Sequence, residues 1–238
     1  MPEISILLDA ETGTMIVEDH QQSSARLLAE LAKLVGWSDG LLCARPSKVL
    51  SPPKASDSDL ASQPCIRVYG YYHNSLIEGP GRRTTVLFAG CNSRCKGCAV
   101  PYLQPITAGS LVSVGSLADA LLDPAYSRNG VSISGGEPFL QPDGLLALVR
   151  ALRKRGCRHI LVYTGYTYEG LLVRARQEPA IGAVLDEIDI LIDGPYVEAL
   201  TDEAGPWTGS GNQRVIHLQA LRRRGKLGSA TGRSSLIW

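Results

Sequence analysis

From Cys65 onward, short apolar runs alternate with amphipathic stretches that have the spacing of helices. The runs expected to form strands are 66–72, 84–89, 130–134, 159–163, 188–192 and 214–218, and the expected helices are 116–122, 142–155 and 167–177. This alternation predicts an α/β fold in which helices pack on a parallel sheet, either open or rolled into a barrel. In such folds the functional loops lie at the carboxyl ends of the strands.

The first 64 residues follow a different pattern. Residues 3–8 and 14–18 have the composition of two short strands, and 23–37 carries leucines at helical spacing. Two further stretches differ in composition: residues 46–64 are rich in Pro, Ser and Asp, and the C-terminal residues 219–238 are basic. The expected organisation is a small ββα module, a linker, a core domain and a basic, disordered tail, over residues 1–45, 46–64, 65–218 and 219–238 in that order.

Composition excludes several classes of protein. The chain has 238 residues, 44% of them hydrophobic and 20% charged, which is enough apolar material for a folded core. No apolar run approaches the roughly 20 residues that a membrane helix needs, and the first residues show no secretory pattern. We therefore expect a cytoplasmic protein with no membrane contact. The net charge of +1 does not indicate binding to nucleic acid.

Glycine-rich, polar loops follow four of the predicted strands. They span residues 90–98, 135–138, 164–166 and 193–196. Because the carboxyl ends of parallel strands meet at one edge of a sheet, we expect these four loops to gather on one face. This convergence predicts a functional site there, whatever family the chain belongs to.

The first of these loops carries three cysteines, Cys91, Cys95 and Cys98, within eight residues. A structural zinc site takes four protein ligands, and a four-iron cluster usually takes four cysteines. No fourth Cys or His lies close by in the sequence. Three cysteines on a four-iron cluster leave one iron open to an outside ligand, and this is the interpretation we favour. A zinc site completed from elsewhere in the chain and unligated thiols are the alternatives.

The cysteine loop, together with Gly135-Gly136-Glu137 after the next predicted strand of the core, resembles the radical S-adenosylmethionine superfamily. Within it the chain is most similar to the activating enzymes of glycyl radical enzymes, nearest to the branch that serves anaerobic ribonucleotide reductase. The likeness covers residues 65–218. Further segments that carry it are 78–83, 163–166, 192–196 and 207–213.

The resemblance implies a partial (β/α) barrel of the radical S-adenosylmethionine type, with a [4Fe-4S] cluster held by Cys91, Cys95 and Cys98. The cluster would cleave S-adenosylmethionine reductively to methionine and a 5′-deoxyadenosyl radical, so the cofactors carry the chemistry and no side-chain acid–base pair is expected. The residues implied to contact S-adenosylmethionine are Gly97, Cys98, Ala99, Gly135, Gly136, Glu137, Thr164, Gly165 and Asp193.

The implied partners are two proteins: a glycyl radical enzyme, such as anaerobic ribonucleotide reductase, and an electron donor of the flavodoxin or ferredoxin type. Ala99-Val100-Pro101 stands after the third cysteine, where the activators usually carry an aromatic residue and then Asn. This departure motivates a second hypothesis, a radical enzyme acting directly on a small molecule or peptide. A third is a non-catalytic zinc or iron–sulfur binding module.

Overall fold

The computed structural model describes residues 4–9, 14–19, 49–54 and 63–227, and the chain divides into two units, Met1–Pro46 and Ser47–Trp238. In the first unit, β1 (Ile4–Asp9) and β2 (Thr14–Asp19) form an antiparallel pair with Ile4 opposite Asp19. The two strands expected there are thus present. The helix expected over 23–37 lies outside the described residues.

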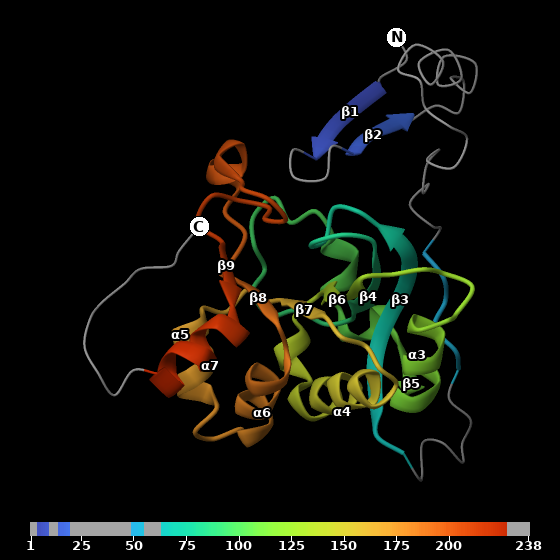
Figure 1. Cartoon of the computed structure of the whole chain (residues 1–238), viewed down its shortest axis with the longest axis vertical. Helices are drawn as coiled ribbons and strands as arrows, with labels where there is room; N and C mark the ends of the chain where they lie inside the picture. Colours follow the sequence, from blue (N-terminus) through green and yellow to red (C-terminus); the bar gives the residue numbers. More distant parts are fainter. Residues whose placement is uncertain (1–3, 10–13, 20–48, 55–62, 228–238) are drawn as a thin grey trace. The chain divides into compact units, whose positions relative to one another are not determined.

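The second unit is built on a seven-stranded sheet in the order β5-β3-β4-β6-β7-β8-β9 (Figure 1). The strands are β3 (Cys65–Ser75), β4 (Arg83–Phe88), β5 (Ser110–Ser113), β6 (Gly130–Gly135), β7 (Ile160–Tyr163), β8 (Ile190–Asp193) and β9 (Arg214–His217). The four central strands, β4, β6, β7 and β8, are parallel, which confirms the α/β class.

The expectation of a parallel sheet holds for the central strands but not for the two edges. β3 is antiparallel to β4 and β5, and β9 is antiparallel to β8. The connection between β3 and β4, residues 76–82, is too short for a crossover, which takes about a dozen residues or more, so these two strands can only pair as a hairpin. β5 is four residues long, and it was not expected from the sequence.

Helices cover one face of this sheet and bury its main apolar cluster. They are α3 (Val114–Leu121), α4 (Pro142–Lys154), α5 (Tyr168–Arg174) and α6 (Pro179–Glu187). Alternate strand residues such as Val86 and Ile133 face α4, whose buried side chains are Leu145, Leu148, Val149 and Leu152. The sequence predicted three of these helices. It missed α6, which begins at Pro179, a residue suited to the first turn of a helix.

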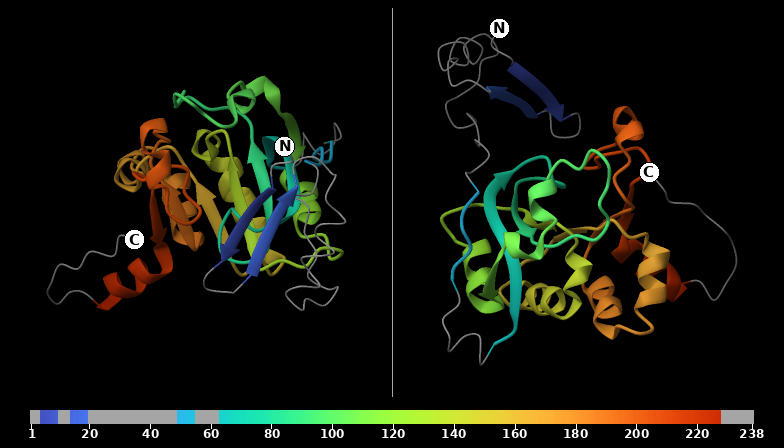
Figure 2. Two further views of the ribbon diagram at one scale, coloured as in Figure 1. Left: turned by 90° about the horizontal axis from the view of Figure 1, so that it is seen from above. Right: turned by 180° about the vertical axis from the view of Figure 1, so that it is seen from behind.

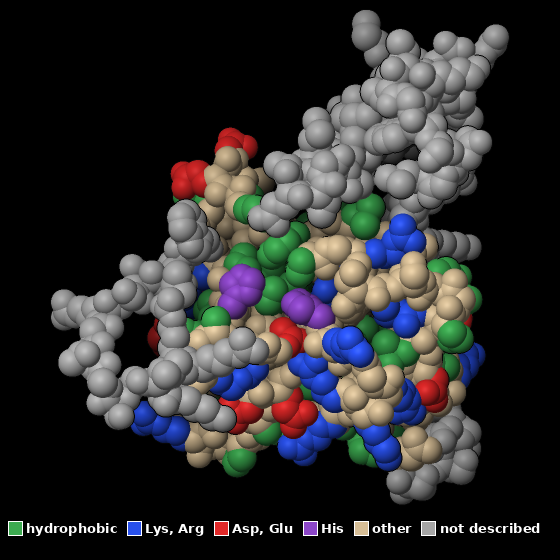
Figure 3. Space-filling model, in the orientation of Figure 1, with side chains coloured by type: hydrophobic (Ala, Val, Ile, Leu, Met, Phe, Trp, Pro, Cys, Tyr) green, Lys and Arg blue, Asp and Glu red, His purple; other side chains and the backbone are tan. Residues whose placement is uncertain are grey.

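A smaller apolar cluster forms on other strand residues, Leu161, Ile190 and Ile192, with Tyr163, Trp207 and Val215 packed against them. Because side chains alternate along a strand, these residues face away from the helices. Figure 3, in the orientation of Figure 1, shows hydrophobic side chains at the surface between two histidines and an acidic projection. That projection is η4 (Glu198–Glu203), which extends beyond the end of the sheet (Figure 1).

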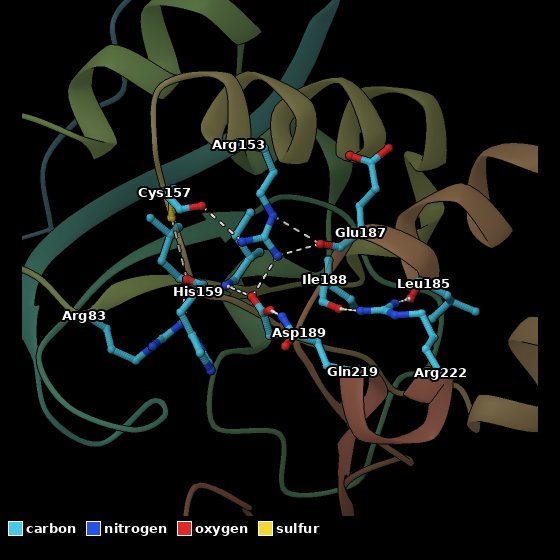
Figure 4. A network of polar contacts seen from close by, with 12 residues as sticks. Arg83, Arg153, Cys157, His159, Leu185, Glu187, Ile188, Asp189, Gln219 and Arg222 are labelled. Atoms are coloured by element: carbon cyan, nitrogen blue, oxygen red, sulfur yellow. Dashed lines mark hydrogen bonds and ion pairs between the residues drawn. The ribbon is translucent and has the colours of Figure 1, made fainter. Parts of the chain in front are cut away.

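The C-terminal stretch differs from its prediction. Residues 219–227 were expected to be disordered, but they belong to helix α7 (Leu218–Leu227). Arg222 of α7 donates hydrogen bonds to the carbonyl oxygens of Leu185 and Ile188, at 2.7 and 3.0 Å, where α6 ends (Figure 4). A cation at a helix C-terminus satisfies carbonyls that have no partner inside the helix, which explains why a basic segment is ordered here.

Part of the predicted linker also belongs to the second unit. Leu50 and Tyr71 of β3 exchange two backbone hydrogen bonds of 2.7 and 3.1 Å. Gly70 allows this approach, because a Cβ atom there would lie 2.7 Å from the carbonyl oxygen of Leu50. None of the helices in the described ranges has the length and apolar character needed to span a membrane.

Candidate functional site

The cysteine loop, residues 89–98, follows β4 and is fixed at its base by backbone hydrogen bonds. The amide of Gly90 donates to Leu103 at 2.8 Å, and that of Cys91 donates to Gln104 at 2.9 Å. Within the loop, Arg94 and Gly97 have φ angles of 45° and 70°. Left-handed residues reverse the chain direction over a short distance, so the three cysteines stand on a tightly folded turn.

The three thiols of this loop are half-buried, and none is in a disulfide. Sulfur donors of this kind suit iron–sulfur clusters and soft metal ions, and three of them can each take a different iron of one cluster. The donor set therefore fits the implied cluster in its chemistry. In the part of the chain that the structure describes, no group of three or more His, Cys, Asp or Glu side chains has the geometry of a metal-ion site. The ligand role of Cys91, Cys95 and Cys98 stays a prediction.

Gly135 and Gly136 bring the loop after β6 into direct contact with the cysteine loop. The amide of Gly136 donates to Phe88 at 2.8 Å, and that of Glu137 donates to Gly90 at 2.7 Å. A Cβ atom on Gly136 would lie 2.1 Å from the carbonyl oxygen of Gly90. Only glycine permits this contact, so the glycine pair expected at the site has a steric reason to be there.

Glu137 is buried, and its carboxylate joins the loops after β6 and β7. Oε1 accepts from the Phe139 amide at 3.0 Å and from the Thr164 hydroxyl at 2.9 Å, and Oε2 accepts from the Gly165 amide at 2.8 Å. Burial raises the pKa of Glu137 above its ordinary value, although these hydrogen bonds act in the opposite direction. Three of the residues predicted for the site, Glu137, Thr164 and Gly165, are thus brought together.

Gly165 and Tyr166 complete the contact with the cysteine loop. A Cβ atom on Gly165 would lie 2.8 Å from Oγ of Ser93. The Tyr166 hydroxyl exchanges hydrogen bonds with the side chain of Asn92, at 2.9 Å to Nδ2 and 3.3 Å to Oδ1. The Arg174 guanidinium lies 4.6 Å from the centre of the Tyr166 ring. The sequence did not single out Asn92 or Arg174, because nothing local in the chain indicates that Tyr166 contacts Asn92 or that Arg174 of α5 lies over the Tyr166 ring.

Asp193 ends β8 and is buried in an ion pair. Its Oδ1 accepts from Nε of Arg214 at 2.9 Å, and its Oδ2 accepts from the Tyr168 amide at 2.6 Å. Arg214 also binds Glu169 through both carboxylate oxygens, at 3.1 and 2.7 Å. Hydrogen bonds to the two acids raise the pKa of Arg214. Asp193 therefore joins β8 to β9 and α5, and its predicted contact with S-adenosylmethionine stays a prediction.

Gly97 and Ala99, which flank Cys98, are exposed. Gly97 lies against η4, since a Cβ atom there would be 2.7 Å from Oε1 of Glu198. Lys96 forms an exposed ion pair of 3.4 Å with the same carboxylate. The loop after β4 and η4 meet at the same end of the sheet (Figure 2). The structure thus shows which segment covers Gly97, a contact that the sequence did not indicate.

The segment 78–83 leads into β4, whose first residue is Arg83, and so lies toward the opposite end of the sheet. Arg83 is fully buried; its Nε donates to Oγ of Ser132 at 2.5 Å and its Nη2 to the carbonyl of Val131 at 2.7 Å. Burial lowers the pKa of Arg83 to about 10. Glu78 accepts from Oγ1 of Thr85 at 2.6 Å. These contacts give the segment a structural role at the start of β4.

Comparison with known proteins agrees with this site. Residues 77–216 match the family described as "4Fe-4S single cluster domain". The anaerobic ribonucleoside-triphosphate reductase-activating protein of Haemophilus influenzae is 36% identical over 154 residues, which are 62% of this chain and 94% of that protein. Its counterpart from Escherichia coli K12 is 34% identical, with 65% of this chain and all of that protein covered.

Two further likenesses cover less of the chains. The pyruvate formate-lyase-activating enzyme of Clostridium pasteurianum is 33% identical over 43% of this chain and 44% of that one. The crystal structure of QueE from Escherichia coli matches with a TM-score of 0.39 at 20% identity, over 48% of this chain and 58% of that chain, which is too low to bear on the fold. The family match and the near-complete coverage of the reductase-activating proteins decide the assignment. This chain belongs to the 4Fe-4S single cluster domain family and, within it, to the radical S-adenosylmethionine activating enzymes.

Proposed function

We propose that this chain generates a glycyl radical on a partner enzyme, such as anaerobic ribonucleotide reductase, and that Cys91, Cys95 and Cys98 hold the [4Fe-4S] cluster it uses. The observation that carries the proposal is the contact of three loops, in which Gly90, Glu137 and Gly165 join the ends of β4, β6 and β7. When bound, the cluster supplies one electron that breaks a carbon–sulfur bond of S-adenosylmethionine and yields a 5′-deoxyadenosyl radical.

The chain's own residues bind and orient S-adenosylmethionine. We assign backbone contacts with its methionine part to Gly135 and Gly136, because the absence of side chains leaves their peptide groups accessible. Glu137, Thr164 and Gly165 hold the loops after β6 and β7 in register through the hydrogen bonds described above. We assign the adenine contact to Gly97, Cys98 and Ala99. Asp193 contributes by fixing the end of β8 through Arg214.

We further propose that the sheet forms the partial (β/α) barrel of this superfamily. The apolar cluster of Leu161, Ile190 and Ile192, with Trp207 packed against it, supports this, because it places buried apolar side chains on the face of the sheet away from the helices, which is the inner face of a barrel. An apolar interior protects a carbon radical from water and from side reactions. The electron donor is proposed to be of the flavodoxin or ferredoxin type. The cytoplasmic location stays a prediction.

The test is oxygen-free reconstitution with iron and sulfide, followed by reduction with dithionite in the presence of S-adenosylmethionine. We expect about four irons per chain and formation of 5′-deoxyadenosine and methionine. Cys95→Ala should abolish cluster binding, whereas Cys65→Ala, which removes a half-buried thiol outside the loop, should keep the full iron content. One zinc per chain with no uptake of iron would contradict the proposal.

The partner is tested separately, since Ala99-Val100-Pro101 also favours a radical enzyme that acts directly on a small molecule or peptide. We expect the reduced, cluster-containing protein to produce the electron paramagnetic resonance signal of a glycyl radical when anaerobic ribonucleotide reductase is added. 5′-Deoxyadenosine formation that requires a small substrate, with no signal on the reductase, would favour the second function instead.

A further inference from the structure

One pair of side chains connects the first part of the cysteine loop to the loop after β7. The Asn92 amide donates to the Tyr166 hydroxyl at 2.9 Å, and the hydroxyl donates to Oδ1 of Asn92 at 3.3 Å. Asn92 stands between Cys91 and Cys95, directly after the first of them. In the part of the chain that the structure describes, residues 92–94 make no other hydrogen bonds. The hydrogen-bonded support of this part of the loop therefore comes from Tyr166.

The second part of the loop, between Cys95 and Cys98, has support of its own. The Cys98 amide donates to the carbonyl of Cys95 at 3.3 Å, which closes this turn. Gly97 lies against Glu198 of η4, on a different side chain from the one that holds Asn92. Loss of the Tyr166 hydroxyl would therefore release the first part of the loop and leave the second part in place.

Tyr166 is itself held by contacts that do not involve the cysteine loop. Its amide donates to Oγ1 of Thr164 at 3.1 Å, and its carbonyl accepts from the Gly194 amide at 2.9 Å. The Arg174 guanidinium lies 4.6 Å from the centre of its ring, and Nη2 of Arg174 donates to the carbonyl of Phe139 at 3.2 Å. The loops after β6, β7 and β8 thus fix the place of the hydroxyl, and the cysteine loop is attached to it.

Arg174 is placed over the Tyr166 ring although this leaves one of its donors without a partner. Its Nη1 is buried and has no hydrogen-bond partner among the described residues. A buried donor in this state destabilises the folded chain, so hydrogen bonding alone does not explain an arginine at this position. The attraction between a guanidinium and the face of an aromatic ring offsets part of this cost. We therefore assign to Arg174 the role of orienting Tyr166.

We propose that Tyr166 is a positioning residue for the cluster: through Asn92 it fixes the part of the loop between Cys91 and Cys95 relative to the segments assigned to S-adenosylmethionine. The proposal rests on the proposed function, because it requires both cysteines to be cluster ligands. Groups behind metal ligands orient them, and their loss changes metal affinity or activity. A loosened loop must be ordered again when S-adenosylmethionine binds, so the loss of Tyr166 should appear in the affinity for that molecule.

The test is the affinity of the oxidised, cluster-containing protein for S-adenosylmethionine, measured by calorimetry, because no cleavage occurs without a reductant. Tyr166→Phe removes the hydroxyl and keeps the ring next to Arg174. We expect an unchanged iron content and a dissociation constant that is about three- to tenfold higher, the factor that one hydrogen bond contributes. The matched control is Tyr168→Phe, which removes the hydroxyl of another half-buried tyrosine, on α5, and should bind as the unmodified protein does.

A double-mutant cycle with Asn92→Ala shows whether Tyr166 acts through Asn92. If it does, the two single variants and the double variant should have about the same dissociation constant, since all three lack the same contact. Effects that multiply, or an Asn92→Ala variant that binds as the unmodified protein does, would mean that Tyr166 contacts S-adenosylmethionine directly and would overturn the positioning role. If Tyr166→Phe loses iron, Asn92→Ala should lose as much, and a loss in Tyr166→Phe alone also overturns that role.

Kinetics with dithionite separate this proposal from a merely structural role and from the proposed function. In Tyr166→Phe the KM for S-adenosylmethionine should rise by the same factor as the dissociation constant, whereas a merely structural role would lower stability in urea and leave KM unchanged. Unchanged affinity and KM in Tyr166→Phe overturn the positioning role and leave the proposed function intact. An unmodified protein that takes up no iron, or that does not cleave S-adenosylmethionine with dithionite, overturns the proposed function itself.

Discussion

The hydroxyl of Thr164 donates a hydrogen bond of 2.9 Å to Oε1 of Glu137, and this bond connects the loops that follow two neighbouring parallel strands. The second carboxylate oxygen accepts from the Gly165 amide at 2.8 Å. Only 1% of the Glu137 surface is exposed, so water cannot replace these donors. An ionised carboxylate only accepts hydrogen bonds, so its two oxygens can satisfy all three donors that converge on it.

Glu137→Gln should destabilise the protein by about 1–3 kcal/mol, because the NH₂ group of glutamine cannot accept a hydrogen bond, and a buried donor left without a partner costs about that much. Thr164→Ser keeps the hydroxyl and serves as the control, with a loss below about 1 kcal/mol. Urea unfolding of both variants measures the effect. Unchanged stability of Glu137→Gln, together with weaker binding of S-adenosylmethionine, would show that the carboxylate serves the cofactor rather than the loops.

Asp193→Asn should lower the free energy of unfolding by about 2–3 kcal/mol. Breaking a fully buried ion pair typically lowers it by about 3–5 kcal/mol, but the partner Arg214 is partly exposed here. Glu169→Gln alters the other acid bound to Arg214, but this residue is 65% exposed in its side chain, so we expect a loss below about 1 kcal/mol. Thermal or urea unfolding of the two variants tests whether Asp193→Asn loses more stability than Glu169→Gln. Equal losses in both would contradict the structural role assigned to Asp193.

The sequence predicted the elements that depend on local pattern and missed those that depend on distant contacts. Gly135, Gly136 and the cysteines were identified because each follows an apolar run, and parallel strands bring such loops together. Arg214 was not identified, because its two acidic partners lie at least 21 residues away. α7 was taken for disordered tail for a similar reason, since the carbonyls that hold Arg222 belong to residues 34–37 positions earlier.

Gly136→Ala and Gly182→Ala should change stability in opposite directions. At Gly136 a Cβ atom would lie 2.1 Å from the carbonyl oxygen of Gly90, so the loops must separate, at a cost of at least about 2 kcal/mol. At Gly182, inside α6, the closest neighbour of a Cβ atom would be 3.6 Å away, an ordinary contact. Alanine should stabilise that helix by about 0.5–1 kcal/mol. Destabilisation by Gly182→Ala, or a neutral Gly136→Ala, in urea unfolding would contradict the packing described here.

The last prediction concerns pH and His73 of β3. This histidine is 1% exposed; its Nδ1 lies 3.0 Å from Oγ1 of Thr84, and its ring stacks on Tyr126 at 3.9 Å. Burial, followed by the charge of Arg128, lowers the pKa of His73 below its ordinary value. Below about pH 6.5 the unfolded chain therefore binds a proton that the folded chain does not, so the stability contributed by His73 is complete above that pH and is lost as the pH falls.

His73→Asn removes this titration, so the free energy of unfolding of the unmodified protein should fall more steeply than that of the variant between pH 7 and pH 5. The comparison is made at matched iron content, which cancels any effect of pH on the cluster. His217→Asn, at an exposed position of β9, is the control and should follow the unmodified protein. Parallel pH curves for the unmodified protein and His73→Asn would show that His73 takes up its proton equally well in the folded and unfolded chain.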